Sequence, residues 1–518
     1  MNKSSPWLKD GLISLIAGAA LGAVLAAFSA PPFGQAYLGS FILSALSIFG
    51  LIRAWRWAGS EKILGIILLT AFGLRLVLGV VFLTVLPSAG YADSPVQKAG
   101  YIYADAYERD QAAIQLVKSG ESVFTPFLKQ LKSDQYGGLL TISALIYKGL
   151  SPDAARPLLI TLLGAFTMTA GLAFFWTAVK NLFGRRFALI STWVLALYPE
   201  GVLLGASQMR EPFLIGLGCI AFWAALQWKQ DKLKAFLVFA ASFAGMILFS
   251  PPAALVLGGT CLVLVILEFT LSADTTVNRW TGIEVLTLIG FAAFIGGWIW
   301  LKPTLYYEVY AAKTGSGLLQ MLFTIIPPKL TVPFVTIYGL LQPVLPAAIT
   351  EPSVPFWTII GIVRAAGWYF MLPFMLYALF ALGKSAKQEH GWVLLLVGVI
   401  FFVWTVVSSA RAAGDQWDNP RYRAILLPFM AMLFAWVWLR VKDTRSPWFW
   451  RWVAVVSVLT IGFTNWYFAR KWGFGINVSF FPLVAGISGI SALILLGGAI
   501  WDWTRQRVGK TSKELHHG

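Results

Sequence analysis

Long apolar runs recur along the whole chain and leave few folds open to it. Each run holds about 17 to 25 predominantly apolar residues, enough for a helix rising about 1.5 Å per residue to cross a hydrocarbon core of about 30 Å. With 58% hydrophobic and only 12% charged residues, the composition exceeds what a water-soluble core needs. The sequence predicts an all-α, polytopic transmembrane helix bundle of about fourteen spans, at residues 11–30, 37–53, 63–86, 155–178, 187–204, 212–229, 234–250, 252–269, 283–301, 356–382, 391–409, 423–440, 452–468 and 480–501.

The basic residues indicate how this bundle is oriented. If the N-terminus is cytoplasmic, the inward connections hold "RAWRWAGSEK", "KNLFGRR", "KQDKLK", "RVKDTRSPWFWR" and "RQRVGKTSK". The short outward connections near 31–36 and 250–252 hold no Lys or Arg, as the positive-inside rule requires. The net charge of +17 therefore favours anionic membrane lipids, and no nucleic acid, as its partner. The first run lacks a convincing cleavage site, which indicates an uncleaved first span.

Cysteine and histidine are too scarce for several kinds of site. Both cysteines, Cys219 and Cys261, fall inside predicted spans, so neither a disulfide framework nor a reactive thiolate in water is expected. His390 lies in an inward connection, and the other two histidines end the chain. The outward face therefore lacks a histidine base, a Ser-His pair and a His-ligated zinc site.

Two outward segments, residues 87–154 and 302–355, are too long to be simple connections. In the first, Asp105 to Ser119 is predicted to be a helix with Asp105 and Glu108 in a capping-box arrangement and Gly120 at its end. "GGLLTISALIYKGL" (137–150) is too short to span and is expected to lie on the outer leaflet. The second segment is rich in Pro and Gly, which predicts broken elements that dip into the membrane beside protein.

These features divide the chain into five parts. Residues 1–60 form two N-terminal spans, and residues 61–301 form a core that includes the first outward segment. They are followed by the second outward segment at 302–355, the C-terminal spans at 356–501 and a cytoplasmic tail at 502–518. No period of about 20 to 50 residues indicates a repeat array.

Three charged clusters fall on the outer face in this topology. They are Asp105, Glu108, Arg109 and Asp110; Arg210 and Glu211; and Asp415, Asp418, Arg421, Tyr422 and Arg423. Charged groups near a bilayer are costly unless they are hydrated, paired or functional, so their gathering on one side favours a shared site. Structural roles are the alternative: a helix N-cap for Asp105, a helix-start pair for Arg210 and Glu211, and an interfacial anchor for the arginines of the third cluster. Two further arginines inside spans, Arg75 and Arg364, are expected to be paired within the bundle.

This inventory suits one reaction at a membrane surface, the transfer of a sugar from a lipid phosphate to a hydroxyl. Because a polyprenyl phosphate is already a good leaving group, the reaction needs mainly one carboxylate base and cations that hold the phosphate. Arginine suits the phosphate because its planar fork donates two hydrogen bonds to two oxygens. No histidine is required.

The residues between Tyr136 and Lys232 resemble the membrane glycosyltransferases of the GT-C superfamily. The resemblance is to enzymes of the aminoarabinose-transferase, protein O-mannosyltransferase and glycosyltransferase family 39 type. Its pattern is carried here by Gly149, Arg156, Gly184, Arg185, Arg186, Pro199, Arg210 and Glu211. The first outward segment is similar to the family's first outward loop through Asp105, Ala113, Leu116 and Gly120. "NPRYRAILLPF" is similar to the family's R-Y-x-x-P-x-x-P stretch, with Ile425 close to the place of the first proline.

The resemblance implies an inverting glycosyltransferase that moves a sugar from a polyprenyl-phosphate donor to a hydroxyl of a glycan, lipid or protein. It implies Asp105 as the catalytic carboxylate and Glu211 as the second acid. Residues expected to bind substrate are Glu108, Arg109, Tyr136, Arg210, Arg421, Tyr422 and Arg423. A divalent cation, Mg²⁺ or Mn²⁺, between Asp105 and Glu211 is compatible with this site but is not required by it. No "WWD"-type signature of oligosaccharyltransferases is present, which disfavours a peptide-asparagine acceptor.

The expected location is the plasma (inner) membrane, with the active site on the extracytoplasmic side. A secondary transporter or flippase of lipids or lipid-linked sugars is the main alternative. It would need charged or Gly/Pro-broken spans at the middle of the membrane, and Arg75 and Arg364, which fall inside predicted spans, keep it open.

Overall fold

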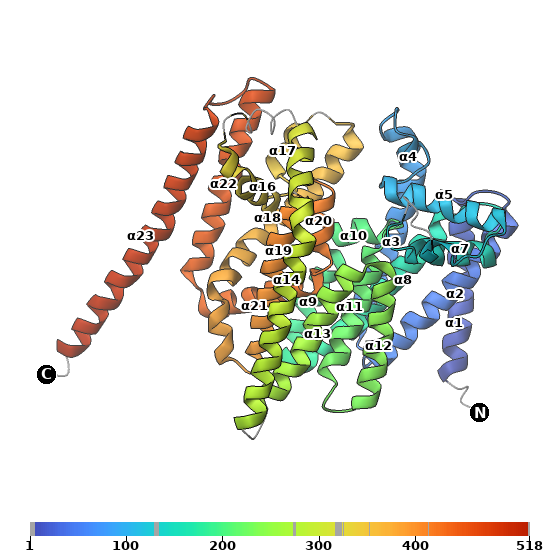
Figure 1. The fold of residues 1–518 in the computed structure, drawn as a ribbon, viewed down its shortest axis with the longest axis horizontal. Coiled ribbons are helices and arrows are strands. Elements are labelled where there is room, and N and C mark those ends of the chain that lie inside the picture. The colour runs from blue at the N-terminus through green and yellow to red at the C-terminus, as the bar shows by residue number, and fades with distance from the viewer. Residues whose placement is uncertain are drawn as a thin grey trace.

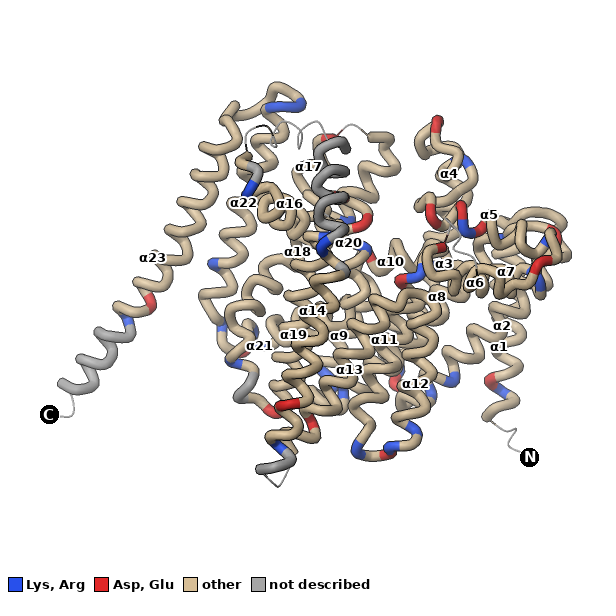
Figure 2. Tube along the Cα trace, in the orientation of Figure 1, with Lys and Arg blue, Asp and Glu red and all other residues tan. Residues whose placement is uncertain are grey.

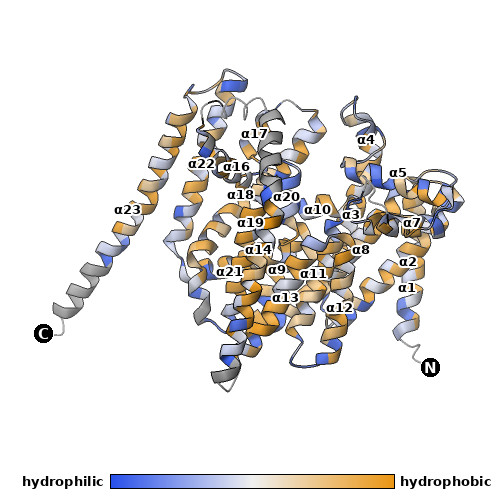
Figure 3. Cartoon of the chain, in the orientation of Figure 1, coloured by the Kyte–Doolittle hydropathy of each residue, from blue (hydrophilic) through white to orange (hydrophobic). Residues whose placement is uncertain are grey.

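The chain folds as an all-α polytopic bundle, seen here in a computed structural model (Figure 1). The structure describes residues 6–128, 134–272, 276–315, 324, 326–351, 353–412 and 414–515. Both chain ends lie toward the lower end of Figure 1, and α4 and α17 lie toward the upper end. Most acidic and basic residues lie toward these two ends (Figure 2), and apolar residues dominate between them (Figure 3).

Eleven helices of the described residues are long and apolar enough to cross a membrane, and up to thirteen if each of two bent pairs is one span. The eleven are α1 (Pro6–Ala27), α2 (Phe33–Trp57), α3 (Lys62–Ala89), α8 (Pro157–Phe183), α12 (Lys232–Phe249), α13 (Pro251–Leu271), α14 (Thr276–Gly315), α18 (Pro355–Ala381, with the 3-10 helix η2 at Leu382–Lys387), α19 (Gly391–Ala412), α22 (Pro447–Lys471) and α23 (Phe480–Leu515). The span predicted at 212–229 is the shorter helix α11 (Glu211–Leu226, 16 residues). Its length of about 24 Å falls short of a hydrocarbon core.

The spans predicted at 187–204 and 423–440 are both broken. The first consists of α9 (Arg185–Leu197) and α10 (Pro199–Gly205), bent by 55°. Tyr198 has extended backbone angles (φ −57°, ψ 124°) because the following proline disfavours helical geometry before it. The second consists of α20 (Asp418–Ala424) and α21 (Leu427–Thr444), bent by 74°, with Pro428 in the first turn of α21. Each break places the end of a short helix beside the charged residues described below.

The core of the bundle is packed around α8, and 72% of the residues in the most apolar stretch of this helix are buried. Helices α8 and α11 approach closely where two glycines meet. A Cβ added at Gly216 would lie 2.3 Å from the carbonyl oxygen of Thr167, and one at Gly171 would lie 2.6 Å from that of Gly216. Small residues at such crossings let the backbones of membrane helices touch. The core also encloses both cysteines.

The first outward segment forms α4 (Pro95–Lys98), α5 (Ala104–Ser119), α6 (Thr125–Leu128) and α7 (Gly138–Leu150). Helices α5 and α7 lie across the direction of α1 and α2 in Figure 1. Helix α7 has 13 residues, so it is too short to span, as predicted. Gly120 ends α5 in the left-handed conformation (φ 74°), also as predicted. The predicted N-cap was wrong: Tyr103 holds that position, and Asp105 is the second helical residue, without a capping hydrogen bond.

In the second of the two long segments, α14 continues to Gly315, so the boundary drawn at residue 301 lies inside a helix. The described part of this segment is broken, as expected from its prolines. A 3-10 helix (η1, Pro328–Leu330) is followed by α16 (Thr331–Leu340) and α17 (Leu345–Thr350). Helix α17 packs against α18 and α22 at the upper end of the bundle.

Candidate active site

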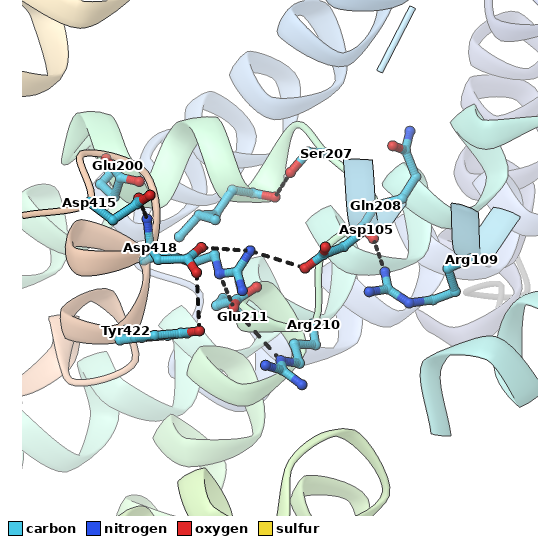
Figure 4. Close-up of polar contacts among 12 residues, drawn as sticks. Asp105, Arg109, Glu200, Ser207, Gln208, Arg210, Glu211, Asp415, Asp418 and Tyr422 are labelled. Atoms are coloured by element: carbon cyan, nitrogen blue, oxygen red, sulfur yellow. Dashed lines mark hydrogen bonds and ion pairs between the residues drawn. The ribbon is translucent and has the colours of Figure 1, made fainter. Parts of the chain in front are cut away.

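The three charged clusters meet at one guanidinium group, that of Arg421. Its Nη1 lies 3.4 Å from Asp105 Oδ2 and 3.3 Å from Asp418 Oδ1, and its Nε lies 3.2 Å from Glu211 Oε1. Figure 4 shows the carboxyl groups of Asp105, Asp418 and Glu211 gathered from three different elements. The structure therefore brings together residues that are more than 300 positions apart in the sequence.

The three carboxylates around Arg421 differ in burial. The side chain of Glu211 is 2% exposed, whereas those of Asp105 and Asp418 are 57% and 41% exposed. Glu211 is the first residue of α11, where the partial positive charge of a helix N-terminus favours a carboxylate. A second guanidinium, that of Arg210, has its Nε 3.9 Å from Glu211 Oε1. Among the described residues Glu211 Oε2 has no hydrogen-bond partner, so one buried oxygen remains open to a ligand.

A first cavity of about 460 Å³ opens on the Asp105 side of this cluster. It lies within the size range of ligand pockets. Its lining comes from the α3–α5 connections, the α16–α18 region and the α19–α20 connection. The lining includes Tyr91, Gln97, Tyr103, Asp105, Glu351, Ser353, Trp357, Arg364, Gln416, Trp417, Asp418 and Arg421.

A second, smaller cavity of about 40 Å³ lies on the Glu211 side. Its lining includes two arginines, one glutamate and three aromatic residues: Arg210, Arg411, Glu211, Tyr136, Trp404 and Tyr422. The Arg210 guanidinium is 5.2 Å from the ring centre of Tyr136, and that of Arg411 is 5.6 Å from that of Tyr422. The N-terminal residues of α13 also line this cavity. Asp105 and Glu211 thus line different cavities, and both contact Arg421.

Arg411 was not among the residues predicted from the sequence. It is close to the end of α19, four residues before the predicted third cluster. In the predicted topology it lies at the outward end of a span, where the positive-inside rule disfavours arginine, and this was the available signal.

A buried ion pair supports the floor of the first cavity. Arg364 Nε is 2.7 Å and its Nη2 is 3.0 Å from the carboxylate of Glu200, and both side chains are less than 5% exposed. Arg364 also donates to the carbonyl oxygen of Gln416 and lies 4.3 Å from the ring centre of Trp417. It therefore holds the connection that leads into Asp418 and Arg421. The expected pairing of Arg364 is confirmed, and its partner Glu200, in α10, was not among the residues predicted from the sequence.

Arg75 was also expected to be paired, but its contacts are different. It is fully buried in α3 and donates from Nη1 to the carbonyl oxygens of Ala71 and Ala196. No carboxylate contact accompanies these two bonds in the part of the chain that the structure describes, and its Nε and Nη2 lack hydrogen-bond partners there.

Helix α5 is fixed by two buried charged side chains, those of Asp110 and Arg109. Asp110 accepts hydrogen bonds from the hydroxyls of Tyr101 and Tyr147, which ties α5 to α7. Burial raises the pKa of Asp110 to about 6, against the opposing effect of these hydrogen bonds and of Arg109. Arg109 Nη1 donates to the carbonyl oxygen of Gln208 (2.9 Å), which ties α5 to the connection that ends at Glu211. Arg109 is thus a buried residue that supports the site from behind its lining.

Two other predicted substrate-binding residues lie outside both cavities. Glu108 is exposed on α5, and it lines neither cavity. Arg423 is buried, donates to the carbonyl oxygen of Gln342 (2.8 Å) and lies 3.5 Å from the ring centre of Trp368. Arg421 and Arg423 are two positions apart in α20, so they project to different sides of the helix. Tyr136, Arg210 and Tyr422, by contrast, all line the second cavity.

The arrangement of acidic residues does not suit the divalent cation considered from the sequence. The described residues hold no group of three or more His, Cys, Asp or Glu side chains that could bind a metal ion. Asp105 and Glu211 are instead bridged by the guanidinium of Arg421, which occupies the place between them.

No family model matches the chain, and no curated protein matches it. Among solved structures, it is similar to two of an oligosaccharyltransferase from Archaeoglobus fulgidus. One is the archaeal oligosaccharyltransferase AglB in complex with an inhibitory peptide and a dolichol-phosphate (12% identity, TM-score 0.33, 83% of this chain and 54% of that chain covered). The other is an apo form (12% identity, TM-score 0.36, 82% and 54% covered). The chain thus spans about half the length of these proteins, and at TM-scores below 0.5 the interpretation of the site rests on the geometry above.

Proposed function

We propose that the protein is an integral membrane glycosyltransferase of the GT-C type. In this proposal it moves a sugar from a polyprenyl-phosphate donor to a hydroxyl of a glycan, lipid or protein, with inversion at the anomeric carbon. The observation that carries the proposal is the position of Arg421 between Asp105, which lines the first cavity, and Glu211, which lines the second. A carboxylate on one side and arginines on the other are what such a transfer needs.

Asp105 is the general base in this mechanism. Its side chain is 57% exposed in the first cavity, so an acceptor hydroxyl bound there can reach it. As the acceptor oxygen forms its bond to the anomeric carbon, its proton passes to Asp105. The acceptor enters from the first cavity, and the phosphate leaves toward the second. The nucleophile and the leaving group are then on opposite faces of the anomeric carbon, and the reaction proceeds with inversion.

The second cavity receives the phosphate of the donor. When the bond between the anomeric carbon and the phosphate oxygen breaks, the electron pair stays on the phosphate and adds negative charge to it. Arg210 and Arg411 line this cavity and stabilise that charge. Tyr136 and Tyr422 hold the two guanidinium groups through their rings. Glu211 keeps Arg210 and Arg421 in place, at 3.9 and 3.2 Å.

The same proposal places the reaction on the extracytoplasmic side of the plasma (inner) membrane, with both termini in the cytoplasm. The basic inward connections then face the anionic lipid of the cytoplasmic leaflet. The lipid part of the donor remains in the outer leaflet while its phosphate reaches the second cavity.

Transport of a lipid-linked sugar is the alternative that one observation favours. The spans α9–α10 and α20–α21 are each broken, with bends of 55° and 74°. Broken spans are typical of transporter sites. Both breaks, however, also serve the cluster, because α10 carries Glu200 and α20 carries Arg421.

The test is transfer of radiolabelled sugar from polyprenyl-phosphate mannose and glucose by the purified protein in lipid vesicles. Asp105→Asn should lower turnover by about 10² to 10⁴-fold while donor binding is kept, because a general base contributes about that factor. Glu121→Gln, an exposed acid just beyond the same helix, is the matched control and should retain turnover. Unchanged turnover in Asp105→Asn would refute the role of the base. Movement of the intact labelled lipid across the bilayer without transfer would favour the transporter.

A further inference from the structure

The first cavity combines aromatic rings with a rim of hydrogen-bond acceptors. Trp417 lies edge to face with two neighbours, at 5.2 Å from Trp357 and 5.9 Å from Tyr103, measured between ring centres. Arg364 covers the ring of Trp417 at 4.3 Å. All four residues line the cavity together with Tyr91. The floor of the cavity is thus a fixed aromatic surface rather than a collection of mobile side chains.

The polar groups of this cavity include three carboxylates and two amides. Asp105, Asp418 and Glu351 contribute carboxylates, and Gln97 and Gln416 contribute amides. Of the two guanidinium groups of the cavity, that of Arg364 is paired with Glu200, which lies outside it. That of Arg421 is shared between Glu211, also outside it, and the lining residues Asp105 and Asp418. The cavity therefore presents more negative than free positive charge to a ligand.

One buried hydroxyl of this lining lacks a partner. The side chain of Tyr103 is 7% exposed, and its Oη makes no hydrogen bond within the described residues. A buried hydroxyl without a hydrogen-bond partner is destabilising, so a ligand with hydroxyl groups would stabilise it. By contrast, Tyr91 Oη and Ser353 Oγ bond each other at 2.6 Å near the exposed mouth of the cavity.

We propose that the acceptor is a carbohydrate, whose sugar ring binds in the first cavity against Trp417 and whose hydroxyls donate to the surrounding carboxylates and amides. This inference rests on the proposed function and names its acceptor class. A sugar has apolar C–H faces and a rim of hydroxyl donors, the complement of an aromatic floor with acceptor groups around it. The carboxylates would repel a phosphorylated acceptor. An aliphatic alcohol would displace water from the carboxylates without replacing the lost hydrogen bonds.

The experiment separates this inference from the proposed function by measuring two reactions of the same wild-type protein. Hydrolysis of radiolabelled polyprenyl-phosphate mannose and glucose, without acceptor, reports the donor reaction. Transfer is then measured to three probes: a panel of methyl glycosides and disaccharides, a Ser/Thr-containing peptide and a long-chain prenol. Hydrolysis together with preferential transfer to a saccharide supports the inference. Hydrolysis with transfer only to the peptide or the prenol overturns it and leaves the proposed function standing, whereas neither reaction overturns both.

Two variants test the cavity itself. Trp417→Ala should raise KM for the saccharide by up to about tenfold, the equivalent of about 1.4 kcal/mol for one lost aromatic contact. Glu351→Gln, at an exposed position that is safer for folding, should also raise this KM. Trp472→Ala removes a tryptophan that is 58% exposed and outside the cavity, and should leave KM unchanged. Saccharide transfer with the same KM in all three variants would overturn the assignment of the acceptor to this cavity.

Discussion

Replacing Arg421 by Met tests whether buried charge, rather than packing, stabilises the region between the two cavities. In the structure the Arg421 guanidinium is 3.2 Å from Glu211, and both side chains are at most 5% exposed. At an effective dielectric constant of about 20, opposite charges at this distance attract by about 5 kcal/mol. Arg210, at 3.9 Å, supplies a contact of about 4 kcal/mol that remains in the variant. Asp105 and Asp418 are partly exposed, so water compensates for their loss of Arg421.

The expected cost is therefore set by Glu211, which would be left with a single cation at a greater distance. Removing one partner of a buried ion pair costs about 3 to 5 kcal/mol, and Arg421→Met should fall at the lower end of this range. The double variant Arg421→Met/Glu211→Gln should recover most of the loss, because no uncompensated carboxylate remains. Unfolding in mixed micelles, followed by tryptophan fluorescence during a titration with sodium dodecyl sulfate, measures both.

The control is an ion pair of similar distance at the surface. Arg185 and Glu61 are 2.8 Å apart, but the Arg185 side chain is 61% exposed. Arg185→Met should cost no more than about 1 kcal/mol. The reasoning fails if Arg185→Met is as costly as Arg421→Met, or if the double variant is no more stable than Arg421→Met alone.

Two further predictions concern the parts that support the site. Burial raises the pKa of Asp110 from 3.8 to about 6, so the folded state binds a proton more tightly than the unfolded chain, and wild-type stability should fall by about 3 kcal/mol as the pH rises from about 4 to 6. Thermal midpoints should show a smaller fall in Asp110→Asn, and parallel curves would contradict this. Gly216→Ala should destabilise the bundle by about 1 to 3 kcal/mol, because its Cβ would meet the backbone of Thr167 at 2.3 Å. Gly259→Ala, with no atom within 4 Å of its Cβ, should be neutral, and equal losses in the same micelle titration would refute the packing argument.

Much of the bundle could be predicted from hydropathy. Each span must form its backbone hydrogen bonds within the helix and must be apolar over a fixed length. The left-handed Gly120 and the short helix α7 were also predicted from local sequence. The bends at Tyr198 and before Leu427 were not, since hydropathy averages over a break that proline makes within one or two residues. The start of α5 was missed because Asp105 is a good N-cap by type, whereas the helix begins one residue before it.

The site shows which part of such a prediction depends on tertiary structure. Composition and topology could place Asp105, Glu211 and Arg421 on one face, but their mutual distances depend on where α10 and α20 break and turn toward α5. Within α20 the sequence offered Arg421 and Arg423 as equivalent candidates, and a helix separates residues two positions apart by roughly 200°. Only one of the pair can then face the carboxylates, and the other packs on Trp368. The break between α9 and α10 also explains why Glu200 was not predicted. Its partner Arg364 is 164 positions away in the sequence, and the break brings the two charges to hydrogen-bonding distance beneath the first cavity.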